Sequence, residues 1–303
     1  MIVVFGSVNA DLFLNVARLP ARGETVLCPT YIFRPGGKGA NQAVAAAAAG
    51  GAVKMIGLVG RDSYAQPVLN ALRAAGVDAS LVEQSDGVTG TAAVMVEAGG
   101  ENQIVVASGA NMQVTADQIP DALLTKGTTL LLQMELPVEE IEAAIWRARQ
   151  SGCRIILNLA PALPIAEAAI RYCDVLVLNQ SEANSLAGVE RDPGEQAAAF
   201  AQRYALDCII TLGGRGAVLA TSDTLLRIGA LDIEPVDTVG AGDAFVGVLA
   251  TCLDSGAAIS YALRQASVAA GLACLQEGAQ SGLPTRAEIE SVSPRLAPPW
   301  MLI

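Results

Sequence analysis

The sequence predicts an α/β protein with one doubly wound, mostly parallel sheet, helices on both faces of that sheet, and a small β-sheet lid. From residue 117 onward, strand-like and helix-like segments alternate regularly, which is typical of parallel strands joined by helices. The first strand-like run, 2–5, is wholly apolar, as expected for a strand buried on both faces. Four β-rich pieces interrupt the alternation. We therefore expect a single domain over 1–303, with a lid formed by about 12–33 and 90–108.

The N-terminal half supplies the first parallel strands and the pieces of the lid. In order, the expected strands are 2–5, 12–16, 25–33, 53–59, 91–96 and 103–107. The segment 99–102, Gly-Gly-Glu-Asn, joins the last two and is a hairpin signal. Helices are expected from the glycine-rich stretch 35–42 to residue 49 and over 66–75, with Gly76 ending the second helix.

The C-terminal half continues the alternation to its end. Its expected helices are 116–124, 138–150, 165–171, 194–204, 244–253 and 259–275, and its expected strands are 129–133, 154–158, 175–178 and 208–211. A hairpin over 216–236 is expected to end in a strand at 231–236. The last ten residues, 294–303, are Pro-rich and then apolar, which predicts a tail that lies on the surface or contributes to an interface.

Composition excludes several classes of function. Charged residues make up 16% of the chain and apolar residues 52%, so the chain is not disordered. The net charge of −11 argues against a nucleic-acid partner. The absence of histidine excludes Ser-His-Asp and Cys-His nucleophile systems and any His-ligated metal.

The sequence also predicts the protein's location. The six cysteines are scattered without a C-x-x-C pair, which favours reduced, buried thiols over disulfides. The N-terminus lacks a basic region before Asp11 and is not typical of a signal peptide. The uncharged run 39–53 is too short and too rich in Ala and Gly to span a bilayer. We expect a cytoplasmic protein without a membrane partner.

The segment 237–245, Asp-Thr-Val-Gly-Ala-Gly-Asp-Ala-Phe, is the strongest candidate for a catalytic site. Gly240 and Gly242 permit a tight turn, and a helix that begins near Gly242 directs its free N–H groups into that turn, where they suit a phosphate. Asp243 places a carboxylate at the same point, where it would accept a proton from an attacking hydroxyl. The alternative is that Asp243 only caps the helix.

A second glycine-rich segment, 35–42, precedes an Ala-rich helix. Its glycines bring the backbone close to another group, and Lys38 and Asn41 offer donors there. It is neither a Walker loop nor a dinucleotide fingerprint. The alternative is a plain glycine-rich turn into a buried helix. Polar residues also follow several strands, at the edge where open α/β sheets bind ligands: Ser7, Asn9, Asp11, Glu135, Asn179 and Glu182.

The two glycine segments resemble the two signatures of the ribokinase family of carbohydrate kinases. Shorter matches fall in the expected order between and around them, at 6–11, 109–111, 133–135, 178–179 and 211–216. The resemblance covers nearly the whole chain. It implies a kinase that phosphorylates a sugar or nucleoside hydroxyl with ATP and Mg²⁺, and a homodimer formed through the lid.

The resemblance also implies roles for individual residues. Asp243 corresponds to the catalytic base, and the turn of Gly240, Ala241 and Gly242 leads into the anion hole, which the amides of 241–243 form. The positions that correspond to sugar-binding residues are Asn9, Asp11, Gly37, Lys38, Gly39, Asn41, Glu135 and the base Asp243.

Further positions correspond to the nucleotide and cation sites. Asn179 and Glu182 match a motif that organises Mg²⁺ and phosphate, although ordinary helix capping would explain them too. The nucleotide positions are Thr211, Gly213, Gly214, Gly216 and Ser267, and the positions of a site for K⁺ are Asp237, Val239, Ala273, Gln276, Gly278 and Gly282. Ser267 replaces an Asn and Gly282 replaces a Ser of the family pattern, so we expect a weaker nucleotide contact and weaker K⁺ binding.

The leading hypothesis is therefore ATP-dependent phosphorylation of a sugar, D-ribose to ribose 5-phosphate. Within the same class, the acceptor is alternatively deoxyribose, fructose or a nucleoside, because a few side chains set that choice. From another class, a sugar-binding regulatory protein without activity is the alternative, which the intact Asp243 disfavours. The missing fingerprint disfavours a dinucleotide oxidoreductase.

Overall fold

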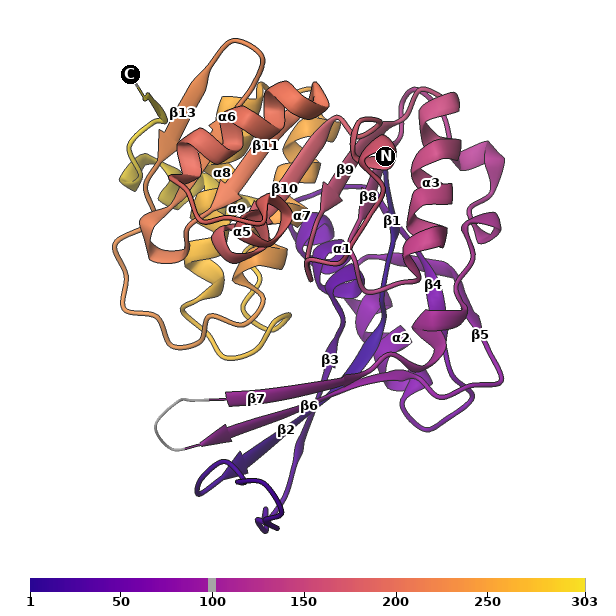
Figure 1. Ribbon diagram of the computed structural model, residues 1–303. Helices are drawn as coiled ribbons and strands as arrows, with labels where there is room; N and C mark the ends of the chain where they lie inside the picture. The colour runs from indigo at the N-terminus through magenta and orange to yellow at the C-terminus, as the bar shows by residue number, and fades with distance from the viewer. Residues whose placement is uncertain (98–101, 303) are drawn as a thin grey trace.

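A ten-stranded sheet forms the centre of the molecule, for which a computed structural model describes residues 1–97 and 102–302 (Figure 1). Its order is β14-β13-β12-β11-β10-β9-β8-β1-β4-β5. The strands are β1 (Ile2–Phe5), β4 (Val53–Val59), β5 (Asp78–Gln84), β8 (Thr129–Leu132), β9 (Arg154–Asn158), β10 (Val175–Asn179), β11 (Asp207–Thr211), β12 (Ala217–Ala220), β13 (Leu225–Ile228) and β14 (Trp300–Met301). The strands from β5 to β11 are parallel, and the other three add antiparallel strands at one edge.

Helices cover both faces of this sheet, as predicted for a doubly wound fold. They are α1 (Lys38–Ala48), α2 (Ala65–Ala74), α3 (Val138–Gln150), α4 (Glu167–Ile170), α5 (Gln180–Ala187), α6 (Pro193–Tyr204), α7 (Ala241–Asp254), α8 (Ile259–Ala273) and α9 (Arg286–Val292). Successive residues of β1 enter different cores: Val4 lies with α1, α7 and α8, whereas Val3 and Phe5 lie with α3 and α6. No helix among 1–97 and 102–302 is both long and apolar enough to cross a membrane.

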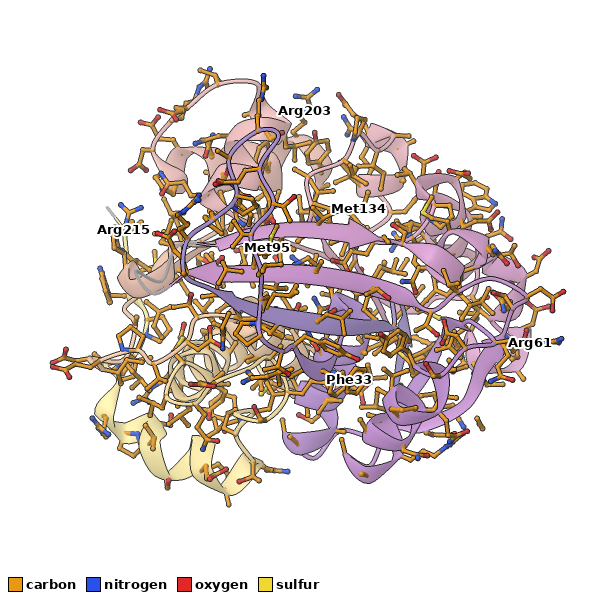
Figure 2. The ribbon with its side chains drawn as sticks, turned by 90° about the horizontal axis from the view of Figure 1, so that it is seen from below. Phe33, Arg61, Met95, Met134, Arg203 and Arg215 are labelled. Atoms are coloured by element: carbon orange, nitrogen blue, oxygen red, sulfur yellow. The ribbon has the colours of Figure 1, made fainter. Side chains whose placement is uncertain are left out.

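A separate four-stranded sheet extends from one end of the body (Figure 1). We call it the small sheet; its order is β3-β2-β6-β7, with bounds β2 (Asn9–Val16), β3 (Ile32–Gly36), β6 (Gly90–Glu97) and β7 (Asn102–Ala107). Figure 2, which views the molecule from below, shows its strands running side by side across the body. The predicted turn residues 99–101 lie outside the described residues.

Two of the predicted elements are wrong because a proline interrupts them. The segment 25–31 is not a strand, since it contains Pro29, which has no N–H for a ladder; pairing begins at Ile32. The segment 116–124 is not an α-helix but two short 3₁₀ turns, Ala116–Gln118 and Asp121–Leu123, separated by Pro120.

The predicted strand at 231–236 is also wrong. This segment is irregular, and the N–H groups of Val236 and Asp237 donate to the carbonyl of Cys274 instead of a neighbouring strand. The expected helix at 165–171 is reduced to the four residues of α4. The sequence patterns missed β5, α5 and α9, and the C-terminal tail pairs with β13 as β14.

Candidate active site

The N-terminus of α7 forms the anion-binding turn that the glycines predicted. Gly240 is the N-cap residue in the left-handed conformation, with φ 80°, and a Cβ there would overlap Ala279. Within the described part of the chain, the N–H groups of Gly242 and Asp243 have no hydrogen-bond acceptor, whereas Ala241 N–H donates to the carbonyl of Thr238. Two free donors therefore point out of a helix N-terminus, where an anion is stabilised.

Asp243 lies at the same helix end and is only 7% exposed. Its Oδ2 accepts a hydrogen bond from Asn41 Nδ2 at 3.0 Å, and its Oδ1 accepts one from Gln42 Nε2 at 3.0 Å. No side chain caps α7, so the alternative that Asp243 is a helix cap does not hold. The two amides of α1 fix the carboxylate beside the free N–H groups.

The sequence analysis missed the amide chain behind Asp243. Gln42 Nε2 also donates to Asn158 Oδ1 at 2.9 Å, and Gln42 Oε1 accepts from Gln133 Nε2 at 2.7 Å. All of these side chains are buried. Asn158 in β9 and Gln133 directly after β8 thereby fix the orientation of the Gln42 amide, whose NH₂ group donates to Asp243.

The first glycine segment lies against β1 and Glu135. Gly37, with φ 87°, is the N-cap of α1. Lys38 N–H donates to Glu135 Oε2 at 3.0 Å, and Gly39 N–H donates to Ser7 Oγ at 3.2 Å. Ser7 Oγ in turn donates to Glu135 Oε2 at 2.6 Å. The N–H groups of Lys38 and Gly39 are therefore already satisfied within the protein, and the predicted sugar contacts of this segment remain predictions.

Asn9 and Asp11 begin β2 and are mostly enclosed. Asn9 Oδ1 accepts from Asn111 Nδ2 at 2.7 Å. Asp11 Oδ1 is buried and has no hydrogen-bond partner among the described residues. Burial and then the charge of Glu135 raise the pKa of Asp11 from 3.8 to about 7. A buried acceptor without a donor suits a ligand that brings hydroxyl groups.

Three cavities surround these residues. The largest, about 530 Å³, is lined by the predicted nucleotide residues, with Thr238 and the irregular segment 230–235. The second cavity, which we call the middle cavity, is the smallest of the three at about 240 Å³. It shares the lining residues Thr211, Thr238 and Gly242 with the largest cavity and is also lined by Lys38 and Asp243. The third, about 360 Å³, has Asn9, Asn111 and Glu135 among its polar lining residues and carries apolar Val106, Met112, Leu136 and Leu163.

Asn179 and Glu182 line the middle cavity and also form a capping box on α5. Asn179 Oδ1 accepts from Glu182 N–H at 2.8 Å, and Glu182 Oε2 accepts from Asn179 N–H at 2.7 Å. Burial raises the pKa of Glu182, and the charge of Asp243 raises the pKa of Lys38. Helix capping therefore explains the hydrogen bonds of Asn179 and Glu182. Both residues also line the cavity that Lys38 lines, and their role in binding Mg²⁺ and phosphate remains a prediction.

Ser267 lines the largest cavity and is 5% exposed. Its Oγ has no hydrogen-bond partner in the part of the chain that the structure describes. This hydroxyl can donate and accept one hydrogen bond to a ligand in the cavity, and the predicted nucleotide contact of Ser267 remains a prediction.

Asp237 connects the anion-binding turn to the chain after α8. Its Oδ1 accepts from Val239 N–H at 2.9 Å and its Oδ2 from Gly278 N–H at 2.8 Å. The residues described by the structure contain no group of three or more His, Cys, Asp or Glu side chains that would hold a metal ion. A Cβ on Gly282 would lie 2.9 Å from the Cβ of Gln276 and 3.1 Å from the carbonyl oxygen of Ala273, so the chain is closed around this glycine.

Free helix-end amides, a buried carboxylate and a lysine around one cavity define a site for transferring an anionic group to a hydroxyl. The family model "pfkB family carbohydrate kinase" matches residues 1–286, and the chain belongs to that family. It is 38% identical to the ribokinase of Bacillus subtilis (96% of this chain, 98% of that protein) and 34% identical to the deoxyribokinase of Salmonella typhi (94% and 95%).

Solved structures of similar fold agree with this assignment. Ribokinase from Thermotoga maritima superposes with a TM-score of 0.89 at 30% identity, covering 96% of this chain and 98% of that one. Arabidopsis thaliana ribokinase complexed with ribose and ATP gives a TM-score of 0.88 at 29% identity, again covering 96% and 98%. The predicted family and fold are confirmed.

Proposed function

We propose that the protein is an ATP-dependent sugar kinase that converts D-ribose to ribose 5-phosphate. The observation that carries the proposal is Asp243, a buried carboxylate held by two amides beside the free N–H groups of α7. Asp243 would take the proton of the attacking hydroxyl, and the free N–H groups would stabilise the charge on the transferring phosphoryl group.

ATP would lie in the largest cavity, with its phosphates in the middle one. Ser267 Oγ and the glycines 213, 214 and 216 line the nucleotide end, and Lys38 lines the phosphate end. Glu182 fits a Mg²⁺ ion there, because this cation keeps most of its ligands from water and phosphate and needs few protein oxygens. When bound, Mg²⁺ supplies neutralising charge to the phosphates.

The sugar would lie between the middle and third cavities. Asn9, Asp11 and Glu135 offer a polar end that suits several hydroxyl groups. Asp11 Oδ1 has no partner among the described residues, so an acceptor with one hydroxyl fewer could leave it unpaired, and such buried groups discriminate strongly. We therefore favour ribose over 2-deoxyribose, although a deoxyribokinase is among the relatives.

A substrate panel tests the proposal. ADP release would be measured with ribose, 2-deoxyribose, fructose and nucleosides as acceptors. The highest kcat/KM with ribose would support the assignment, and a preference for another acceptor would replace it within the same class. Binding of a sugar without any ADP release would instead indicate the regulatory alternative.

We propose that the small sheet is the predicted lid and that it forms a homodimer interface. Apolar side chains are exposed on it: Ile32, Ile104 and Val106 share one face by their register, and Val105 lies on the other. A single sheet of this size with exposed apolar side chains gains stability by being covered. Sedimentation at micromolar concentration should show a dimer; a monomer would remove this proposal and leave the kinase proposal intact.

We also propose K⁺ as an activator and a cytoplasmic location. The carbonyl oxygens of Val239, Ala273, Gln276 and Gly278 accept no hydrogen bond from the described residues, so they suit a weakly hydrated cation beside Asp237. All six cysteines are free, which fits a reducing compartment.

A further inference from the structure

Arg34 on β3 contacts both the small sheet and the segment after α8. Its guanidinium donates to Glu277 Oε2 at 3.0 Å and lies 5.0 Å above the centre of the Phe13 ring. It also lies against Gly278, where a Cβ would overlap it. The Arg34 side chain is 24% exposed, so most of it is enclosed by these contacts.

The segment 275–282, which we call the supporting loop, touches the anion-binding turn directly. Gly278 N–H donates to Asp237, whose other oxygen holds Val239 N–H. Ala279 lies against Gly240, the N-cap of α7.

The supporting loop also reaches the catalytic carboxylate. Gln280 Nε2 donates to Asn41 Oδ1 at 2.9 Å, and Asn41 Nδ2 donates to Asp243. A displacement of this loop would therefore move the turn, its free N–H groups and the partner of Asp243 together.

The small sheet is held on the opposite side as well. Phe33 points to the other face of β3 and stacks on Tyr64, with ring centres 5.9 Å apart. Asp11 pairs directly opposite Arg34 in the ladder of β2 and β3. The strand pair that presents Asp11 to the acceptor is thus the pair that holds the supporting loop.

We propose that Arg34 is a positioning residue for phosphoryl transfer. It joins the small sheet to the supporting loop, so that an acceptor bound against Asp11 steadies the anion-binding turn at the start of α7. This inference rests on the proposed kinase function. It predicts that acceptor and nucleotide bind cooperatively and that Arg34 carries this cooperativity.

The opposing explanation is that Arg34 and Glu277 form an ordinary surface ion pair. Such a pair contributes little to stability, and Glu277 is exposed. Its removal would then leave both kcat and the cooperativity unchanged. The two explanations therefore differ in kinetics and in linked binding, not in the thermal midpoint.

The test compares Arg34→Met, which keeps most of the apolar stem, with Arg34→Lys and Glu277→Gln. Arg203→Ala is the matched control, because Arg203 pairs with Glu167 on the surface and lies well away from Phe33 in Figure 2. The measurements are kcat, both KM values, and the Kd of ADP with and without ribose (or whichever acceptor the panel selects).

We expect Arg34→Met to lower kcat about tenfold with little change in acceptor KM, and to abolish the tightening of ADP by the acceptor. Arg34→Lys should retain part of the wild-type kcat and part of the tightening of ADP. If Glu277 is the essential contact, adding Arg34→Met to the Glu277→Gln variant should change neither quantity further. Wild-type kcat in Arg34→Met, or no tightening of ADP in the wild type, would overturn the inference. A wild type that phosphorylates no acceptor would instead overturn the proposed function.

Discussion

The two glycine-rich turns of this protein both begin at a glycine with positive φ, yet their backbone N–H groups differ in what they contact. Gly37 before α1 has φ 87° and Gly240 before α7 has φ 80°, and neither helix has a side-chain cap. In the first turn, the N–H groups of Lys38 and Gly39 are taken by Glu135 and Ser7. In the second, those of Gly242 and Asp243 have no acceptor in the described chain.

The difference shows that a glycine-rich turn before a helix predicts that another group comes close to its backbone. It does not predict whether that group belongs to the protein or to a ligand. In the first turn another part of the protein approaches: a Cβ on Gly39 would overlap the backbone of Gly6 and Ser7. In the second, Gly242 has nothing within 4 Å of such an atom and lines two cavities. The first turn therefore offers its cavity the side chain of Lys38, whereas the second offers free backbone N–H groups together with the carboxylate of Asp243.

The largest effect should come from Asp243→Asn in the second turn. The amide cannot accept a proton, and it would place an NH₂ group against the donors of Asn41 or Gln42. We expect kcat to fall by roughly 10²-fold or more. Steady-state kinetics and circular dichroism measure the change. A folded variant with near-wild-type kcat would exclude Asp243 as the base.

A pair of alanine substitutions would test the two turns against each other. Gly242→Ala should leave the thermal midpoint almost unchanged and weaken ATP binding, because its methyl group enters open space meant for phosphate. Gly39→Ala should destabilise the fold by about 1–3 kcal/mol, because its methyl group meets backbone atoms. Thermal unfolding and the KM for ATP separate the two results. The comparison fails if both variants lose stability equally.

Sequence periodicity predicted the large sheet well because its strands are apolar on both faces. The predicted bounds 138–150 and 154–158 match α3 and β9. Prolines explain two of the three false elements, those at 25–31 and 116–124. The position of Asp243 in the first turn of α7 was predictable because its signal is local, a carboxylate that follows two glycines at the start of a helix.

The supporting side chains carried no such local signal. Gln42 and Asn158 are 116 positions apart, and Arg34 and Glu277 are 243 apart. Only the tertiary fold brings them together, so no spacing in the sequence indicates the contact. A polar residue inside an Ala-rich helix, as at Gln42, was the one available hint.

The first turn should respond to pH through its neighbour Asp11. The pKa of Asp11 is raised to about 7, so the folded state binds this proton more tightly than the unfolded chain does. The free energy of unfolding should therefore fall, on the order of 3 kcal/mol, as pH rises from about 4 to 7. Asp11→Asn should remove this dependence in denaturant titrations. A pH-independent wild type would contradict the raised pKa.

The same titration should appear in acceptor use. In the proposed role, ionised Asp11 would accept hydrogen bonds from sugar hydroxyls, so kcat/KM for the acceptor should fall by up to about tenfold per pH unit below 7. The KM for ATP should change much less, because Asp11 does not line the nucleotide cavity. Equal changes in both parameters would place the titrating group elsewhere.

The smallest effect should come from K⁺, and it should act on the second turn alone. Asp237 holds Val239 and Gly278 by hydrogen bonds, and a cation bound by the neighbouring carbonyl groups would stiffen this turn further. The first turn needs no such help because Glu135 and Ser7 already hold it. We therefore expect K⁺ to raise kcat and to leave the acceptor KM unchanged. Gly282 supplies no hydroxyl ligand, so activation should be a few-fold and require high concentrations. Initial rates against KCl at constant ionic strength, with Na⁺ and tetramethylammonium as controls, measure it. Equal rates in all three salts would mean that the two hydrogen bonds of Asp237 alone hold the turn.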